Sequence, residues 1–280
     1  MSTRRFSFVQ SLHIVFALGW ADFLLKYRGS TFGYLWSFVG PLFRFLVILY
    51  VFGPYVRPSI PLYPLYLFLG MIIWEYFTNT TNGCMRMLTE KSGIVQRHPF
   101  PRILLILAVG WTNIIIFATH LVIFAVFAWF LGASLHWNII YLPLIALQMT
   151  FVALGVGMIL AAYCLKYRDI KHLWEILVQI LFWLTPIMYP YRVRTAVTAS
   201  ILAFLRHPGL HIMSTLSDIF IHFQPLAIII NDARRVTLYP VAAGSPTFLH
   251  AIGMTLFCAL FFLVGKLIFD RRVPYFNQEY

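Results

Sequence analysis

Six apolar stretches, each close to the length of a membrane-spanning helix, constrain the fold of this chain more than any other feature. A helix needs about 20 apolar residues to cross a bilayer. The stretches that reach or approach this length are residues 34–55, 62–82, 103–131, 139–165, 172–189 and 247–269. Helices satisfy their own backbone hydrogen bonds, as hydrocarbon demands. The sequence therefore predicts an all-α integral membrane protein with six transmembrane helices, forming one domain over residues 1–280.

The composition fits this class and excludes others. Of the 280 residues, 61% are hydrophobic and only 11% are charged, whereas a soluble domain averages about 25% charged residues. In a soluble chain, a net charge of +12 would indicate binding to nucleic acid. Here the cations cluster at the ends of the apolar stretches, where membrane orientation and anionic lipid explain them. We therefore predict contact with membrane lipid and no nucleic-acid partner.

The distribution of Lys and Arg predicts how the chain is oriented. Four groups of cations lie in segments 4–28, 86–102, 166–171 and 266–272, whereas the first two loops on the opposite side contribute only Arg57. Cytoplasmic loops of membrane proteins carry an excess of Lys and Arg. The pattern therefore predicts a multi-pass protein with both termini in the cytoplasm.

Two segments outside the apolar stretches predict helices that do not cross the membrane. Residues 8–27, within the first 33 residues, are apolar but are interrupted by Gln10, His13 and Gly19. They favour a helix in the inner interface, with a seventh, short span as the alternative. Segment 190–246 has apolar runs broken by proline and glycine, which predict re-entrant helices at an extracytoplasmic gate or a peripheral outer cap. Residues 247–280 complete the chain with the last span and a cytoplasmic tail.

Segment 83–102, GCMRMLTEKSGIVQRHPFPR, lies between two apolar stretches and carries four cations. Apolar residues at helical spacing in its first part predict a short amphipathic helix that lies flat under the membrane. Two prolines near its end prevent this helix from continuing smoothly into the next span. An ordinary basic loop is the alternative.

The sequence offers no pattern for catalysis or metal binding. Cys84, Cys164 and Cys258 are isolated from one another, and the histidines are scattered without metal-ligand spacing. The chain also lacks the GxxxxGK[ST] phosphate-binding loop. We therefore predict no catalytic residue, no metal site, no cofactor in this chain and no enzymatic activity.

Short motifs follow one another in an order that is typical of one family. They are KYRGS at 26–30, GYLWS at 33–37 with Gly40-Pro41, GMIIWEYF at 70–77, FPR at 100–102, YRDI at 167–170, TPIMY at 185–189, QPL at 224–226 and DARR at 232–235. Together they resemble the permease subunit of polysaccharide ABC exporters, the Wzm-like proteins for O-antigen and the related teichoic-acid and capsule permeases. Gly40 and Gln224 depart from the pattern, which usually has Asn before Pro41 and before Pro225.

The resemblance implies a homodimer in the bacterial inner membrane, coupled to two copies of a separate ABC ATPase that binds ATP and Mg. A lipid-linked glycan would cross in a channel between the two subunits. Segment 83–102 would be the coupling helix that docks on the ATPase. The residues expected to make this contact are Glu90, Lys91, Ile94, Arg97, Phe100 and Arg102.

Aromatic residues are the candidates for the channel lining, because sugars stack their apolar faces on aromatic rings. Three of them, Trp36, Phe43 and Tyr50, share one face of the first span. The corresponding candidates in the fifth span are Phe182, Trp183 and Tyr189. A second series on another face of the first span is Phe38, Phe45 and Phe52. Either series can instead meet lipid or a neighbouring helix.

Arg44 in the first span and Glu75 in the second are charges predicted at similar depth in the membrane. A charge at such a depth costs at least a few kcal/mol unless it is paired or hydrated. We therefore predict a buried Arg44–Glu75 pair. A further hypothesis is that Arg44 meets a phosphate of the lipid-linked substrate, which a guanidinium binds in bidentate geometry.

Two other functions remain open at this point. An ABC permease for small drugs or lipids shares the general architecture. A membrane-embedded enzyme acting on lipid-linked sugars would need a base or nucleophile facing a cavity.

Overall fold

The computed structural model describes residues 7–29, 33–56, 60–90, 101–133, 137–167, 169–189, 224–239 and 248–273. Every regular element in these ranges is a helix. The α-helices are α1 (Phe8–Tyr27), α2 (Trp36–Val56), α3 (Tyr63–Glu90), α5 (Ile103–Phe130), α6 (Leu142–Cys164), α7 (Ile170–Leu184), α10 (Pro225–Thr237) and α11 (Phe248–Arg272). Two short 3-10 helices, η1 (Gly33–Leu35) and η3 (Trp137–Tyr141), precede α2 and α6. The predicted all-α class is confirmed.

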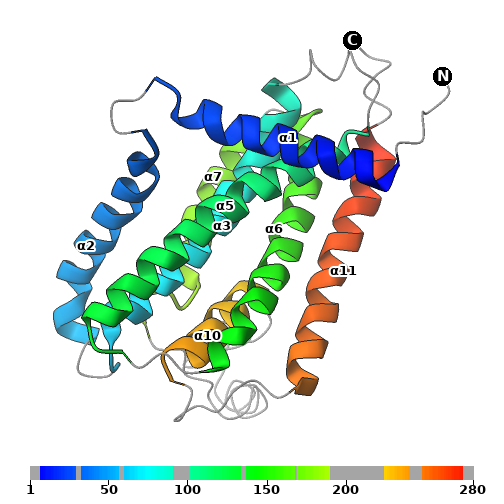
Figure 1. The fold of residues 1–280 in the computed structure, drawn as a ribbon. Coiled ribbons are helices and arrows are strands. Elements are labelled where there is room, and N and C mark those ends of the chain that lie inside the picture. The colour runs from blue at the N-terminus through cyan, green and yellow to red at the C-terminus, as the bar shows by residue number, and fades with distance from the viewer. Residues whose placement is uncertain are drawn as a thin grey trace, which may run out of the picture.

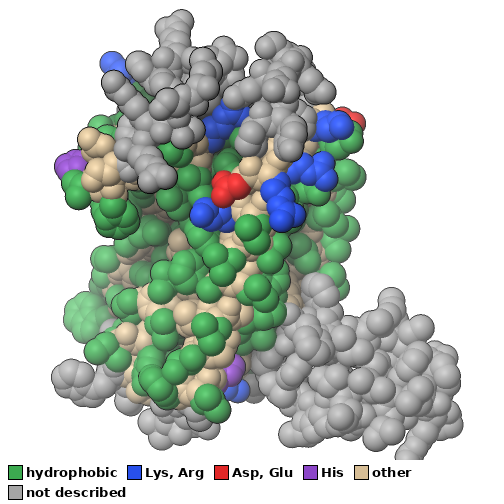
Figure 2. Space-filling view, turned by 90° about the vertical axis from the view of Figure 1, so that its right-hand side faces the viewer, with side chains coloured by type: hydrophobic (Ala, Val, Ile, Leu, Met, Phe, Trp, Pro, Cys, Tyr) green, Lys and Arg blue, Asp and Glu red, His purple; other side chains and the backbone are tan. Residues whose placement is uncertain are grey.

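Most of the long helices form a bundle, and two helices cover its ends. α2, α3, α5, α6, α7 and α11 run roughly along a common direction, whereas α1 lies across one end and α10 lies at the other (Figure 1). We call these the α1 end and the α10 end. On one face, Lys and Arg side chains gather near the α1 end and hydrophobic side chains cover the middle (Figure 2).

Five helices in the described ranges are long and apolar enough to cross a membrane: α1, α2, α5, α6 and α11. This supports a multi-pass membrane protein, although the set differs from the six predicted spans. α3 is absent from it, because the helix contains polar residues such as Glu75 and Asn79 from its middle onward. α7 has only 15 residues, because Pro186 follows and forces the preceding Thr185 into extended backbone (φ −79°, ψ 135°). The count of six therefore stays a prediction.

α1 is apolar enough to span, yet it lies across the bundle rather than along it (Figure 1). It packs against α5 at a close approach, where a Cβ on Gly19 would lie 2.9 Å from the carbonyl oxygen of Ala108. The Thr112 hydroxyl donates a hydrogen bond to the Gly19 carbonyl at 2.8 Å. Other apolar side chains of α1, such as Phe8 and Trp20, are exposed. This crosswise placement favours the predicted interfacial helix over a seventh span.

The centre of the bundle is α3, which contacts α2, α5, α6, α7 and α10. Its apolar half is fully enclosed: Leu65, Leu67 and Leu69 have no exposed surface. Most of the polar residues that follow are buried or partly buried, and some find partners in the neighbouring helices. The Tyr76 hydroxyl pairs with the Thr150 hydroxyl of α6 at 2.8 Å. The indole N–H of Trp174 in α7 donates to the Thr81 hydroxyl at 3.2 Å. Burial in protein, rather than contact with lipid, is therefore what accommodates this polar helix.

The predicted amphipathic helix at the start of segment 83–102 is corrected by the structure. Residues 83–90 form the last turns of α3. Leu88 packs with buried residues of α5 and α6, and Met85 is also buried rather than lying on a free apolar surface. Gly83 lies inside α3, where its missing side chain makes room for Val109 of α5. The prediction that a separate helix begins at residue 83 is therefore wrong.

α6 and α11 approach each other through glycines. A Cβ on Gly155 would lie 2.5 Å from the Phe261 carbonyl oxygen, and a Cβ on Gly265 would meet the carbonyl of Gly155. On another side of α6, Gly157 leaves space for Cys84 of α3. Small residues let helices approach closely in lipid, where dispersion contacts replace the hydrophobic effect. Ala153, Gly155, Gly157 and Ala161 of α6 are all buried, and the two glycines face two different neighbours.

Gly265→Ala is expected to destabilise the protein by about 1–3 kcal/mol, because a methyl group facing a backbone carbonyl forces two helices apart. The measurement is thermal unfolding of the purified protein in detergent. Gly253→Ala in the same helix is the matched control, since a Cβ there meets nothing within 4 Å. Equal melting temperatures for the two variants would contradict the glycine contact.

Candidate functional site

A cavity of about 390 Å³ with a mixed polar and apolar lining lies between α1, α2, α3 and α5, at the α1 end. It collects charged and polar side chains from segments far apart in the sequence. Its lining residues are Lys26, Gly33, Trp36, Ser37, Gly40, Pro41, Arg44, Glu75, Asn79 and Ile116. Two cations and one carboxylate in one recess within a membrane bundle make it the main candidate for binding a charged group.

Local contacts at the start of α2 fix one wall of this cavity. The ring of Phe23 in α1 packs on that of Tyr34 in η1 at 5.3 Å. The Ser37 hydroxyl donates to the Tyr34 carbonyl at 2.7 Å. A ring nitrogen of His120 in α5 lies 3.2 Å from the Ser37 carbonyl oxygen. The first turn of α2 is therefore tied to both α1 and α5.

The predicted partners Arg44 and Glu75 line the same cavity. Arg44 is exposed on the described surface and Glu75 is partly buried, with Asn79 one turn further along α3. The ion pairs among the described residues do not include a direct bridge between the two side chains. Their predicted proximity is observed, whereas the salt bridge itself stays a prediction.

The two aromatic series of α2 face different surroundings. Trp36, Phe43 and Tyr50 are 54%, 64% and 85% exposed. In the other series, Phe45 is buried, with its ring 5.1 Å from that of Phe68 in α3. Phe43 and Tyr50 of the series predicted for the channel are therefore exposed on the outside of the single chain, whereas Trp36 also lines the cavity.

The three candidates of the fifth span are divided by the structure. Phe182 packs edge-on against Trp74 of α3 at 5.7 Å. The Tyr189 hydroxyl donates to the Leu184 carbonyl at 2.6 Å. Only Trp183 is strongly exposed, at 57%, and its ring lies 6.2 Å from that of Phe52. This contact places α7 beside α2, and both helices turn aromatic and aliphatic side chains outward.

Most of the predicted ATPase-docking residues, Lys91, Ile94, Arg97 and Phe100, lie outside the described residues. Glu90 is the last residue of α3, and its side chain is likewise outside the description. Arg102 is described, and its guanidinium donates to the Val273 carbonyl at 3.0 Å. This contact joins the start of α5 to the end of α11, which sequence reasoning did not anticipate.

Arg234 in α10 is a buried cation whose role the sequence did not reveal. Only 1% of its surface is exposed. Its guanidinium donates to the carbonyl oxygens of Tyr66, Pro186 and Ile187 at 3.2, 2.7 and 2.8 Å, and it stacks 3.4 Å above the Tyr66 ring. A side chain on Gly70 would collide with it. Arg234 therefore joins α10 to α3 and to the chain that follows α7. The only signal in the sequence is its place in the DARR motif.

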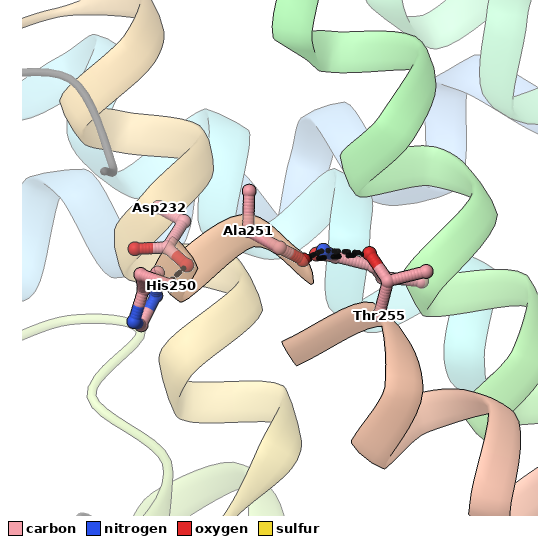
Figure 3. Close-up of polar contacts among 5 residues, drawn as sticks. Asp232, His250, Ala251 and Thr255 are labelled. Carbon is pink, nitrogen blue, oxygen red and sulfur yellow. Dashed lines mark hydrogen bonds and ion pairs between the residues drawn. The ribbon is translucent and has the colours of Figure 1, made fainter. Parts of the chain in front are cut away.

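Other polar contacts attach α10 to the neighbouring elements. A ring nitrogen of His250 in α11 lies 2.9 Å from the Asp232 carboxylate (Figure 3). The Gln148 amide of α6 donates to the Thr255 hydroxyl at 2.9 Å, which connects α6 with α11 beside this pair. Tyr239, just after α10, donates to the Pro61 carbonyl. Burial raises the pKa of the Tyr239 hydroxyl to about 12, so it remains a donor at neutral pH.

α10 itself has only 13 residues and is buried against α3 and α6. It is therefore a short non-spanning helix packed on protein, as a re-entrant segment requires. Within the predicted gate region 190–246, the described residues are 224–239.

Arg234→Met is expected to destabilise the protein by several kcal/mol, because three buried carbonyls lose their donor at about 1–3 kcal/mol each. Arg234→Lys should recover only part of this loss, since an ammonium cannot reproduce the planar fork. Thermal unfolding in detergent is the measurement. The matched control is Arg235→Met, at the adjacent and less buried position. A melting temperature for Arg234→Met equal to that of the control would contradict the joining role.

Comparisons with known proteins give a consistent result. The family of ABC-2 type transporters matches residues 13–194. An O-antigen export system permease protein, RfbA, of Myxococcus xanthus is 29% identical over 196 residues, which cover 70% of this chain and 75% of that protein. An RfbA of Klebsiella pneumoniae is 26% identical over 60% of this chain and 65% of its own length. The polysialic acid transport protein KpsM of Escherichia coli is 22% identical over 56% of this chain and 62% of its own length.

Proposed function

Because the chain belongs to the ABC-2 type transporter family, we propose that it is the membrane permease subunit of an ABC exporter of polysaccharide. The observation that carries this proposal is the family match together with relatives named for export of O-antigen and transport of polysialic acid. Both names refer to carbohydrate polymers, which favours a glycan over small drugs or lipids as the substrate. The chain is a transporter subunit rather than an enzyme, so an enzyme of lipid-linked sugars is not proposed.

The substrate that we propose is a lipid-linked glycan of the O-antigen kind. It would cross between two copies of this chain. The support is the outward aromatic surface of α2 and α7, which includes Phe43, Tyr50 and Trp183. Aromatic rings in contact with a partner subunit or a sugar find there the packing that the single chain does not give them.

An ABC transporter works with an ATPase, and we propose that two copies of a separate ATPase dock at the α1 end and bind ATP and Mg. Segment 91–102 joins α3 to α5 at this end. Its cations suit an acidic or polar groove of the partner. The same end would face the cytoplasm, with both termini there, in the bacterial inner membrane. The gathering of Lys and Arg near it supports this orientation (Figure 2).

The proposed coupling runs along α3. This helix has 28 residues, about 42 Å at 1.5 Å per residue, and reaches from the docking segment to the α10 end. Near its start the Tyr66 carbonyl accepts a hydrogen bond from Arg234 of α10. A displacement of the docking segment by the ATPase would therefore move a rigid helix that is bonded directly to the short helix at the opposite end.

Lys91→Glu combined with Arg97→Glu is expected to reduce co-purification of the ATPase at least several-fold, because both changes reverse charge in the proposed contact. Pull-down of the ATPase with the tagged permease is the measurement. Arg271→Glu, at the end of α11, is a control on the same end of the bundle. Undiminished binding and export by the double variant would overturn the docking assignment.

Phe43→Ala and Tyr50→Ala are each expected to lower glycan export several-fold. The free energy of unfolding should change by no more than about 0.5 kcal/mol, since exposed side chains carry little packing energy. Export is measured as surface glycan in cells, and assembly by size-exclusion chromatography. Trp129→Ala in α5 is the control, because Trp129 is 72% exposed on another helix. Equal export defects at Trp129 would remove the special role of α2.

A further inference from the structure

We propose that the last turn of α11, together with the end of α6, binds the headgroup of an anionic bilayer phospholipid. Figure 2 shows the side of the bundle on which α11 lies in Figure 1. Hydrophobic side chains cover the middle of this face, and Lys and Arg side chains gather near the α1 end. The surface is separate from the cavity beside α2, and the inference does not depend on which substrate the protein exports.

One face of α11 offers a surface for acyl chains. Four leucines recur on it at helical spacing and are each more than half exposed: Leu256, Leu260, Leu263 and Leu267. Arg271 is exposed and lies four residues after Leu267. It therefore continues the same face, about 6 Å further along the helix axis. A phospholipid whose chains lie along the leucines brings its phosphate to Arg271.

A second pair of cations lies where α11 meets α6. The Arg272 guanidinium stands 5.0 Å from the centre of the Tyr163 ring of α6, within the range of a cation–π contact. Lys166 follows Tyr163 by one turn, and its backbone N–H donates to the Tyr163 carbonyl at 3.0 Å. Both cations are exposed. A headgroup at Arg271 therefore also meets positive charge from the seam between the two helices.

These cations have no carboxylate to neutralise them within the part of the chain that the structure describes. The ion pairs found there include none of Lys166, Arg271 and Arg272. The only carboxylate of α11, Asp270, lies 4.0 Å from the ammonium of Lys266. The end of the two helices therefore presents an excess of positive charge, which attracts anionic lipid at a membrane surface.

The combination of features favours a lipid over a protein as the occupant. α11 is long and apolar enough to cross the membrane, so its leucine face lies at the depth of the acyl chains and its last turn reaches the headgroups. A water-soluble partner such as the ATPase reaches the cations but not the leucines. An anionic phospholipid uses both parts of the surface at once.

The test measures binding of cardiolipin and phosphatidylglycerol to the purified permease in maltoside detergent. Native mass spectrometry detects bound lipid, and the rise in melting temperature reports its affinity. Phosphatidylcholine, which carries no net charge, is the control lipid. Arg271→Gln combined with Arg272→Gln should weaken cardiolipin binding at least tenfold, because each cation near the surface contributes about fivefold. Asp270→Asn should strengthen binding, since it removes a repelling charge and releases Lys266.

Two matched controls separate charge at this surface from other effects. Lys171→Gln removes an exposed cation from the start of α7, at the same end of the bundle, and should bind cardiolipin as the original protein does. Arg271→Lys combined with Arg272→Lys keeps both charges and should retain binding. All the altered side chains are exposed, so the melting temperatures without lipid should stay close to that of the original protein.

An equal rise in melting temperature with phosphatidylcholine and with cardiolipin would overturn the proposal, and so would undiminished cardiolipin binding by the double Gln variant. Loss of ATPase co-purification by that variant, with lipid binding intact, would assign the surface to the ATPase instead. The binding experiment contains no glycan, so its outcome is separate from the proposed function. A failure of export in cells would leave the lipid site standing, and a failure of lipid binding would leave the proposed substrate untouched.

Discussion

The structure depends on the burial of one polar helix. α3 carries Glu75, Asn79 and a run of threonines, and it is absent from the helices that are apolar enough to face lipid. Hydrocarbon offers no partners for such groups, so neighbouring helices must enclose them. α5 and α6 do so, and a hydroxyl of α6 accommodates Tyr76. α11 then packs onto α6 through paired glycines. The arrangement of the bundle follows from this sequence of contacts.

The same helix links the two ends of the molecule. Its last turns pack beside the start of α5 at the α1 end, and its first turns accept the guanidinium of Arg234 from α10. Arg234 is a buried cation whose described partners are carbonyl oxygens and an aromatic ring. Such a group fixes the geometry of α10 closely, because a planar fork with three acceptors tolerates little displacement. A rigid connection of this kind suits a subunit that must pass on a movement generated by its ATPase.

α2 and α7 have the opposite character. They sit at the periphery, where they meet through Phe52 and Trp183, and their outward faces remain apolar and aromatic. Near the α1 end, α2 also forms a wall of the charged cavity. The peripheral helices therefore present the exposed aromatic surface, while the buried centre holds the bundle together.

The sequence alone determined the helical class, the membrane environment, the family and the presence of two charges in neighbouring helices, because hydrophobic length, charge distribution and ordered motifs are local properties. It did not reveal that residues 83–90 continue α3, since an amphipathic pattern reads the same whether its apolar side faces lipid or protein. Nor did it distinguish the exposed Phe43 from the buried Phe45, because both lie in one apolar helix. Only tertiary structure decided that Lys26 joins Arg44 and Glu75, and that Arg234 bonds to three carbonyls. The physical reason is that these contacts join residues distant in sequence, and their geometry depends on how whole helices pack.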